Sequence, residues 1–151
     1  MTTNNSVQKG EPVWKILYTS ESPKKLSMVE IDEILVKARN NNHRDHITGQ
    51  LIYCYMNFVQ VLEGPKEAVE ATFAKIQKDS RHTDITLFAS YNGFREFPDW
   101  DMEFTTVEDP AFFAEFISTM TELVNRLDEA STISADFSLK EFIDKIRLKY
   151  G

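Results

Sequence analysis

Two apolar segments of strand length, Ile47–Cys54 and Phe58–Glu63, are separated in this chain by only three residues. Strands joined by so short a connection pair antiparallel, as a hairpin. A segment with helical spacing of its apolar residues lies on each side of the hairpin. Ser27–Asn41 precedes it, and a second helix is predicted to start at Pro65. A further strand is predicted at Val13–Ser20, where apolar and polar residues alternate.

Two more strands are predicted after the second helix, at Ile85–Tyr91 and Trp100–Thr105. The first six elements then follow the β-α-β-β-α-β order of ferredoxin-like folds. The predicted fold class is therefore α+β, a ferredoxin-like βαββαββ sheet with both helices on one face. Asp109-Pro110 and Ser138 each introduce another amphipathic helix. We expect these two C-terminal helices either to cover the open face of the sheet or to bind another subunit.

The chain has 151 residues, the size of one ordinary domain. We divide it into a polar, disordered N-terminal extension at 1–12, a folded domain at 13–106 and a C-terminal helical extension at 107–151. Phenylalanine is frequent, with 11 residues. The Phe-rich third helix is either a cover for the sheet or a surface for a partner.

Charge and motif content exclude several classes of function. The net charge is −7 and the pI is near 5.0, which disfavours direct nucleic-acid binding. A single cysteine, Cys54, and the lack of a signal peptide or a membrane-spanning run indicate a cytoplasmic protein. The three histidines lack metal-ligand spacing, so no metal site is predicted. No phosphate-binding loop or catalytic triad is present in the sequence, and we expect no enzymatic activity.

Three polar side chains are predicted to meet inside the domain. Tyr18 shares a strand face with Trp14 and Ile16, and Gln60 faces away from its neighbours Val59 and Val61. Asn42 follows the last residue of an apolar stripe on the first helix, which is formed by Met28, Ile31, Leu35 and Ala38. A phenol and two amides suit a heteroaromatic ring that carries carbonyls and ring nitrogens. They could equally satisfy one another, since an unpaired buried amide costs about 1–3 kcal/mol.

Four motifs resemble those of BLUF (blue light using flavin) domains, in the family's order and near its spacing. They are Ile16-Leu17-Tyr18-Thr19-Ser20, Asn41-Asn42 followed by Ile47-Thr48-Gly49-Gln50-Leu51, Phe58-Val59-Gln60-Val61-Leu62-Glu63-Gly64, and Trp100-Asp101-Met102. The resemblance covers residues 13 to 106, and the C-terminal layout is similar to that of short, single-domain members. It implies non-covalent binding of a flavin, FAD rather than FMN, although the residues leave that choice open.

The resemblance also implies roles for individual residues. Tyr18 would be the photochemical electron donor, and Gln60 the amide that bonds both Tyr18 and the flavin. Asn42 would hold the carbonyl edge of the ring, with Asn41 beside it. Gln50 stands where many relatives have an apolar residue.

Further assignments from the resemblance concern the light-state relay and the phosphates. Trp100 and Met102 would report the light state. Lys75 and Asp79 occupy positions of phosphate and ribityl contacts, with Arg81 and His82 as alternative phosphate partners. The family commonly has Arg at the position of Lys75, and a Lys offers a point charge instead of a bidentate fork.

The predicted function is that of a blue-light photoreceptor. A light-driven rearrangement of the Tyr18 and Gln60 hydrogen bonds would change how the protein binds a downstream partner, such as a response regulator or a transcription factor. Assembly into a homo-oligomer is expected. The alternative is a ferredoxin-like ligand-binding domain or enzyme without flavin photochemistry.

Overall fold

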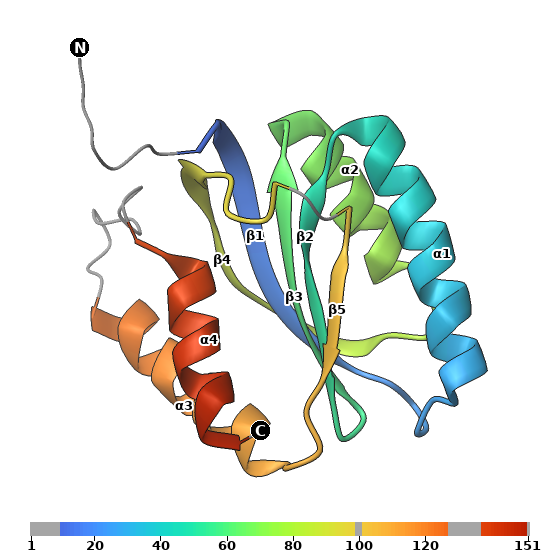
Figure 1. Cartoon of the computed structure of the whole chain (residues 1–151), viewed down its shortest axis with the longest axis vertical. Coiled ribbons are helices and arrows are strands. Elements are labelled where there is room, and N and C mark those ends of the chain that lie inside the picture. The colour runs from blue at the N-terminus through green and yellow to red at the C-terminus, as the bar shows by residue number, and fades with distance from the viewer. Residues whose placement is uncertain (1–9, 99–100, 127–136, 151) are drawn as a thin grey trace.

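A mixed sheet lies at the centre of the fold, between two pairs of helices (Figure 1). The structure is a computed structural model, and it describes residues 10–98, 101–126 and 137–150. The elements in these ranges are β1 (Pro12–Glu21), α1 (Met28–Asp45), β2 (Thr48–Cys54), β3 (Asn57–Gly64), α2 (Lys66–Gln77), β4 (Thr83–Phe94), β5 (Glu103–Thr106), α3 (Ala111–Arg126) and α4 (Leu139–Tyr150). The strand order is β4-β1-β3-β2-β5, with only the β2/β5 pair parallel. The first four strands have the predicted ferredoxin-like arrangement.

The register of the central strands places the predicted polar pair together. β1 and β3 are antiparallel neighbours in which Tyr18 is directly opposite Gln60. The β2–β3 hairpin turns at Tyr55 and Met56, which have φ values of 51° and 73°. Positive φ at both central residues defines a type I′ turn, which matches the twist of the two strands. Gly49 in β2 is required because a Cβ there would collide with the carbonyl oxygen of Val61.

The first helix begins as predicted but ends one turn later. Ser27 accepts a hydrogen bond from the backbone of Glu30 and Glu30 bonds back, which completes the predicted capping box. The helix continues past Asn41 to Asp45, and His46 ends it in the left-handed conformation with φ 59°. Met28 was expected on the buried stripe, but its side chain is 60% exposed and Ile34 is buried instead.

Other boundaries also differ from the sequence-based expectation. Pro65 is the N-cap of α2 and not its first residue, because its ψ of 134° is extended. β4 is longer than predicted because it pairs with almost all of β1. β5 begins at Glu103, so Met102 precedes the strand, and Trp100 lies outside the described residues.

The two faces of the sheet bury separate apolar cores. Ile16, Tyr18 and Leu62 face α1 and α2 in the first core. Leu17, Ile52 and Val61 face α3 and α4 in the second. Phe112, Phe116 and Met120 of α3 are fully buried there. The C-terminal helices therefore cover the open face of the sheet, which was one of the two predicted alternatives.

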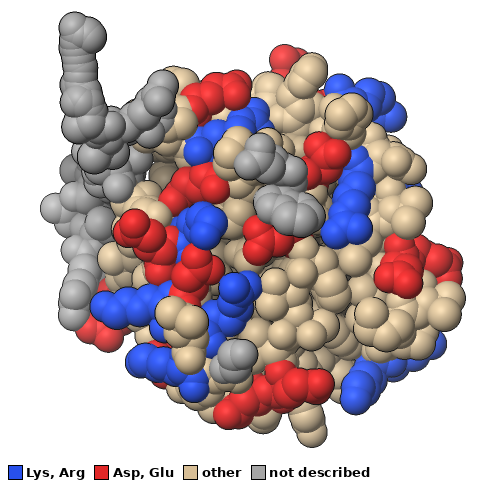
Figure 2. Space-filling view, viewed as in Figure 1, with Lys and Arg blue, Asp and Glu red and all other residues tan. Residues whose placement is uncertain are grey.

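The first described residues are attached to the sheet. The backbone N–H of Arg95 donates to the carbonyl of Glu11, and their side chains form an ion pair. Residues 1–9 of the predicted N-terminal extension lie outside the described residues. None of the described helices has the length and apolar character needed to cross a membrane. On the face in Figure 2, acidic and basic side chains of the described residues are interspersed.

Candidate functional site

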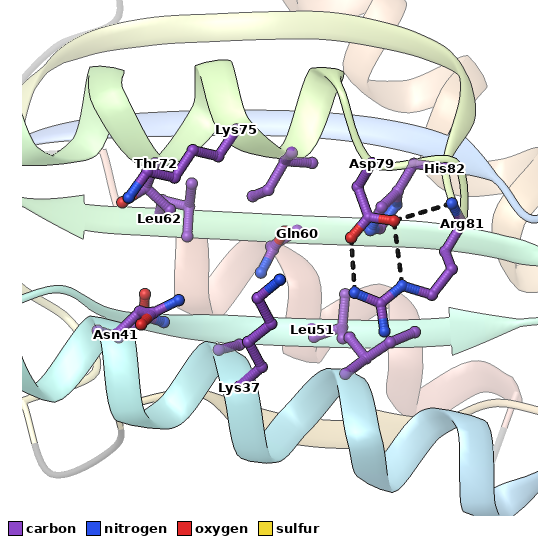
Figure 3. A pocket seen from close by; sticks show the side chains of 14 residues that line it. Lys37, Asn41, Leu51, Gln60, Leu62, Thr72, Lys75, Asp79, Arg81 and His82 are labelled. Carbon is purple, nitrogen blue, oxygen red and sulfur yellow. Dashed lines mark hydrogen bonds and ion pairs between the residues drawn. The ribbon is translucent and has the colours of Figure 1, made fainter.

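A cavity of about 230 Å³ opens between α1 and α2, over β2 and β3 (Figure 3). Its lining combines apolar side chains with amides and charged groups. The lining residues are Ile34, Lys37, Ala38, Asn41, Asn42, Leu51, Gln60, Leu62, Thr72, Lys75, Ile76, Asp79, Arg81 and His82. Such a mixture suits a ligand with a flat apolar body and a polar edge.

Gln60 connects the cavity to two buried side chains behind it. The hydroxyl of Tyr18 donates to Oε1 of Gln60. Nε2 of Gln60 donates to Sδ of Met102 at 3.5 Å. Burial, reinforced by the charge of Asp79, raises the pKa of the Tyr18 phenol well above its usual value, so the phenol keeps its proton. The three side chains form one hydrogen-bonded chain at the wall of the cavity.

Two of the three asparagines of α1, Asn41 and Asn42, line the cavity from the final turns of the helix. Asn42 is 1% exposed, and its Nδ2 donates to the carbonyl of Asp101 at 2.8 Å. Nε of Arg39 donates to the carbonyl of Met102 at 3.1 Å. These bonds attach the connection between β4 and β5 to α1. Asn41 is half-buried and lines the cavity beside Asn42.

Asp79 and Arg81 form a bidentate pair at the end of α2, drawn with dashed lines in Figure 3. Nε and Nη2 of Arg81 donate to the two oxygens of Asp79 at 3.0 and 2.7 Å. Hydrogen bonds from the guanidinium lower the pKa of Asp79 to about 2. One edge of the Arg81 guanidinium is therefore bonded to Asp79, which keeps Arg81 beside the cavity.

His82 closes the same end of the cavity. Its Nδ1 lies 2.9 Å from Oγ of Ser20, and its ring packs on Phe58 with centroids 4.8 Å apart. Burial lowers the pKa of the imidazole below its usual value, with Asp79 opposing and Arg81 adding to this effect. The neutral ring is the form favoured in the folded protein.

Sequence reasoning missed Lys37 and Thr72, although helical spacing could have found both. Lys37 stands four residues before Asn41 on α1, and Thr72 stands three before Lys75 on α2. Figure 3 shows Lys37 pointing from α1 into the space between the helices. Lys37, Lys75 and Arg81 thus bring positive charge to a cavity in a protein of net charge −7.

The donor set fits a flavin. Ile34, Leu51 and Leu62 supply apolar walls for a ring system. The side chains of Asn41, Asn42 and Gln60 supply the amide groups that can bond ring carbonyls and nitrogens. The cationic side chains that line the cavity suit a phosphate.

Comparison with known proteins decides the family. The family model described as BLUF, "Sensors of blue-light using FAD", matches residues 13–103. The chain belongs to the BLUF family. BLUF domains are flavin-based sensors of blue light, so the chain is a sensor domain, in agreement with the expectation that it does not act as a catalyst.

Characterised BLUF proteins resemble this chain in sequence and in fold. The beta subunit of the photoactivated adenylate cyclase of Euglena longa is 31% identical over 119 residues, which are 78% of this chain and 14% of that subunit. The blue light- and temperature-regulated antirepressor BluF of Escherichia coli is 32% identical over 89 residues, 58% of this chain and 22% of the antirepressor. The BLUF protein BlrB, solved in its dark state, has a TM-score of 0.63 and 26% identity, and the match covers 91% of this chain and 96% of that one.

Proposed function

We propose that this BLUF domain binds FAD and converts blue light into a rearrangement of the Tyr18–Gln60–Met102 hydrogen bonds, which alters contact with a downstream effector. The observation that carries the proposal is that chain of side-chain hydrogen bonds at the cavity wall. When bound, a flavin would supply absorption of blue light and, once excited, an acceptor for one electron.

Tyr18 and Gln60 are suited to a coupled transfer of an electron and a proton. The phenol of Tyr18 is the oxidisable group, and its hydroxyl proton already points at Oε1 of Gln60. Loss of an electron makes a phenol strongly acidic, so the proton would move along that bond to the amide. Return of both the electron and the proton to Tyr18 would leave the Gln60 amide in a rotated or tautomeric form. Gln60 would only change its hydrogen bonds, and no substrate would be turned over.

The geometry also explains why the response would be reversible. A half-turn of the Gln60 amide exchanges Oε1 and Nε2, so that Nε2 points at Tyr18 and Oε1 points at Met102. A thioether sulfur cannot donate a hydrogen bond, so the rotated oxygen would lose a partner on that side. The rotated form is therefore less stable unless the ligand supplies a donor, and it decays in the dark.

We assign the remaining cavity residues to the cofactor. Asn41 and Asn42 would hold the ring edge. Lys75, with Arg81 as the alternative, would contact the phosphates, and Lys37 joins them because it lines the same cavity. Asp79 would contact the ribityl chain and orient Arg81. His82 supports the end of the cavity through Ser20 and Phe58.

The output proposed for this chain is a change in protein contacts. Relatives include a cyclase subunit and an antirepressor, which indicates that BLUF domains act on different effectors. A response regulator or a transcription factor is the kind of partner we expect here, together with homo-oligomer formation. We also predict, from the composition and the single cysteine, that the protein does not bind nucleic acid directly and that it is cytoplasmic.

The absorption spectrum of the purified protein, before and after blue light, tests this function. We expect bound oxidised flavin, released by acid and identified as FAD by chromatography, and a small reversible red shift on illumination. Gln60→Ala should still bind flavin, because the asparagines and apolar walls remain, but should lose the red shift. A normal shift in this variant would make Gln60 merely structural. Protein that stays colourless with added flavin would favour a ligand-binding domain without flavin photochemistry.

A further inference from the structure

The start of α4 is capped by a carboxylate from the connection between β4 and β5. Oγ of Ser138 donates to Oε2 of Glu96 at 2.6 Å, and the backbone N–H groups of Leu139 and Lys140 donate to Glu96 at 3.0 and 3.4 Å. The unpaired N–H groups of a first helical turn carry partial positive charge and favour an anion. Ser138 also accepts a bond from the backbone of Glu141, as is typical of the residue that precedes a helix. The start of α4 is therefore capped both by the adjacent Ser138 and by Glu96, which is distant in sequence.

Glu96 belongs to a buried cluster with an excess of negative charge. Nζ of Lys15 lies 2.5 Å from Glu96 and 3.3 Å from Glu63. The exposed fractions of the Lys15, Glu63 and Glu96 side chains are 1%, 0% and 16%, so water screens them little. One lysine faces two carboxylates, and Glu63 also accepts bonds from the backbone of Glu96 and Phe97. The start of α4 supplies the donors that complete the shell of Glu96.

The same connection contacts the flavin site at its other end. Asn42 donates to the carbonyl of Asp101, and Gln60 donates to Sδ of Met102. Only a few residues separate Asp101 from Glu96 along the chain. The connection is thus bonded to the cavity residues on one face of the sheet and to α4 on the other.

We propose that Glu96 is a positioning residue that holds α4 to the β4–β5 connection, so that a change at Gln60 reaches α4 through this carboxylate. The inference rests on the light response proposed above. Movement of Met102 displaces the connection, and the displacement loosens the bonds from Glu96 to Ser138, Leu139 and Lys140. Illumination then releases the first turn of α4.

Hydrogen exchange at the first turn of α4, measured in the dark and in light on the full chain with its flavin, tests the proposal. The absorption spectrum of each sample reports the photochemistry separately. In the wild type we expect faster exchange of the Leu139 and Lys140 amides under light. In Glu96→Gln, exchange should be about tenfold faster already in the dark and should gain little from light, with the red shift retained.

Glu141→Gln is the matched control, because Glu141 is exposed in the same helical turn. Its loss of charge removes only a weak, solvent-exposed interaction with the helix N-terminus, so dark exchange should rise far less than in Glu96→Gln and the light response should be unchanged. Ser138→Asp keeps a good helix cap but sets a second carboxylate against Glu96, and should reproduce the effect of Glu96→Gln even if that variant does not fold. Combining the two substitutions should restore slow dark exchange, because the new amide can donate to the new carboxylate.

The outcomes separate failure of the inference from failure of the function. A wild type with a red shift but no light-dependent exchange at α4 would overturn the role of Glu96. So would wild-type exchange in both Ser138→Asp and Glu96→Gln. A wild type that binds flavin without any red shift would instead refute the proposed photochemistry, and the coupling inferred from it would fall as well.

Discussion

Within the described residues, the side chain of Gln60 makes two hydrogen bonds. Both partners are side chains, those of Tyr18 and Met102. Asn42, by contrast, donates to the backbone carbonyl of Asp101. An amide bonded only to side chains can reorient without breaking a strand pairing or a loop. At the scale of single residues, this difference separates a group that can switch from one that fixes the architecture.

Tyr18→Phe should separate packing from photochemistry. The ring against Phe73 remains, so the loss of one hydroxyl should cost only about 0.5–1.5 kcal/mol of unfolding free energy. Phenylalanine is much harder to oxidise and has no phenolic proton. We therefore expect flavin binding and a near-normal dark spectrum, no red-shifted state, and a longer fluorescence lifetime.

Tyr53→Phe is the control for this substitution. Tyr53 is buried in the same core, and its hydroxyl bonds Ser22 and the backbone of Leu26. It should lose similar stability and keep the red shift. A full red shift with wild-type yield in Tyr18→Phe would remove Tyr18 from the mechanism.

His82 should make the folded protein sensitive to mild acid. Its pKa is lowered by burial, so the folded state binds a proton less readily than the unfolded state. The stability that neutral His82 contributes to the folded state is fully present above the unfolded pKa of about 6.5. It is lost as the pH falls through the lower pKa of His82 in the folded state. Urea unfolding at several pH values between 7.5 and 5 should show a smaller decline in His82→Asn than in the wild type, at equal flavin loading.

His46→Asn provides the comparison, since His46 is exposed and asparagine tolerates its left-handed backbone. Its decline should match that of the wild type. Equal slopes in the wild type and His82→Asn would show that protonation of His82 does not oppose folding.

At the scale of elements, local signals predicted the strands and helices well where one face is buried. The capping box at Ser27 and the alternation in β1 led to the observed elements. The end of α1 was misplaced because Asn40, Asn41 and Asn42 are weak helix formers, and the helix is held there by contacts such as Asn42 to Asp101. Bonds between distant residues, such as Glu96 to the start of α4, leave no local pattern and could not be predicted.

In the candidate site, too, positions set by local patterns could be predicted and positions set by distant contacts could not. Tyr18 and Gln60 could be placed on one face because strand alternation and the strand order fix their direction. The pairing of Arg81 with Asp79 and the contact of His82 with Ser20 depend on how the chain turns after α2, and no spacing rule gives that turn.

The β2–β3 turn offers a test at the level of one element. Tyr55 and Met56 both have positive φ, a conformation that costs an ordinary residue about 1–2 kcal/mol. Replacing the pair by Asn-Gly should raise the unfolding free energy by about 1 kcal/mol, because these residues suit a type I′ turn. Met28→Gly, at an exposed helical position without positive φ, should lower it. Destabilisation by the Asn-Gly turn would mean that packing of Met56 outweighs its backbone strain.

At the scale of the whole molecule, the sheet separates the layer of α1 and α2, which holds the cavity, from the layer of α3 and α4. The charges of Lys15, Glu63 and Glu96 connect the central strands with the start of α4. Lys15 comes from β1 and Glu63 from β3, both central strands. Glu96 and Phe97 come from the β4–β5 connection, and Glu96 reaches α4. Loss of this cluster would therefore weaken several elements together.

Lys15→Met should be among the most destabilising single substitutions in this chain. Methionine fills a similar volume, but two buried carboxylates are left without their cation, which typically costs about 3–5 kcal/mol. Unfolding by urea should show a large drop in midpoint with one transition, because the cluster contacts the central strands, the β4–β5 connection and the start of α4. Adding Glu63→Gln should recover part of the loss, since an amide can still bond Thr48 and the backbone without a charge.

The exposed pair of Lys24 and Glu30 is the control, with Lys24 70% exposed. Lys24→Met should change the midpoint far less, because water already solvates both charges. If Lys15→Met proved no more harmful than Lys24→Met, the cluster would not be what holds the β4–β5 connection and α4 to the central strands, and the apolar cores alone would do so. If Lys15→Met were harmful but Glu63→Gln gave no recovery, the loss would lie in the contacts of Lys15 with Glu96 and the Phe94 carbonyl.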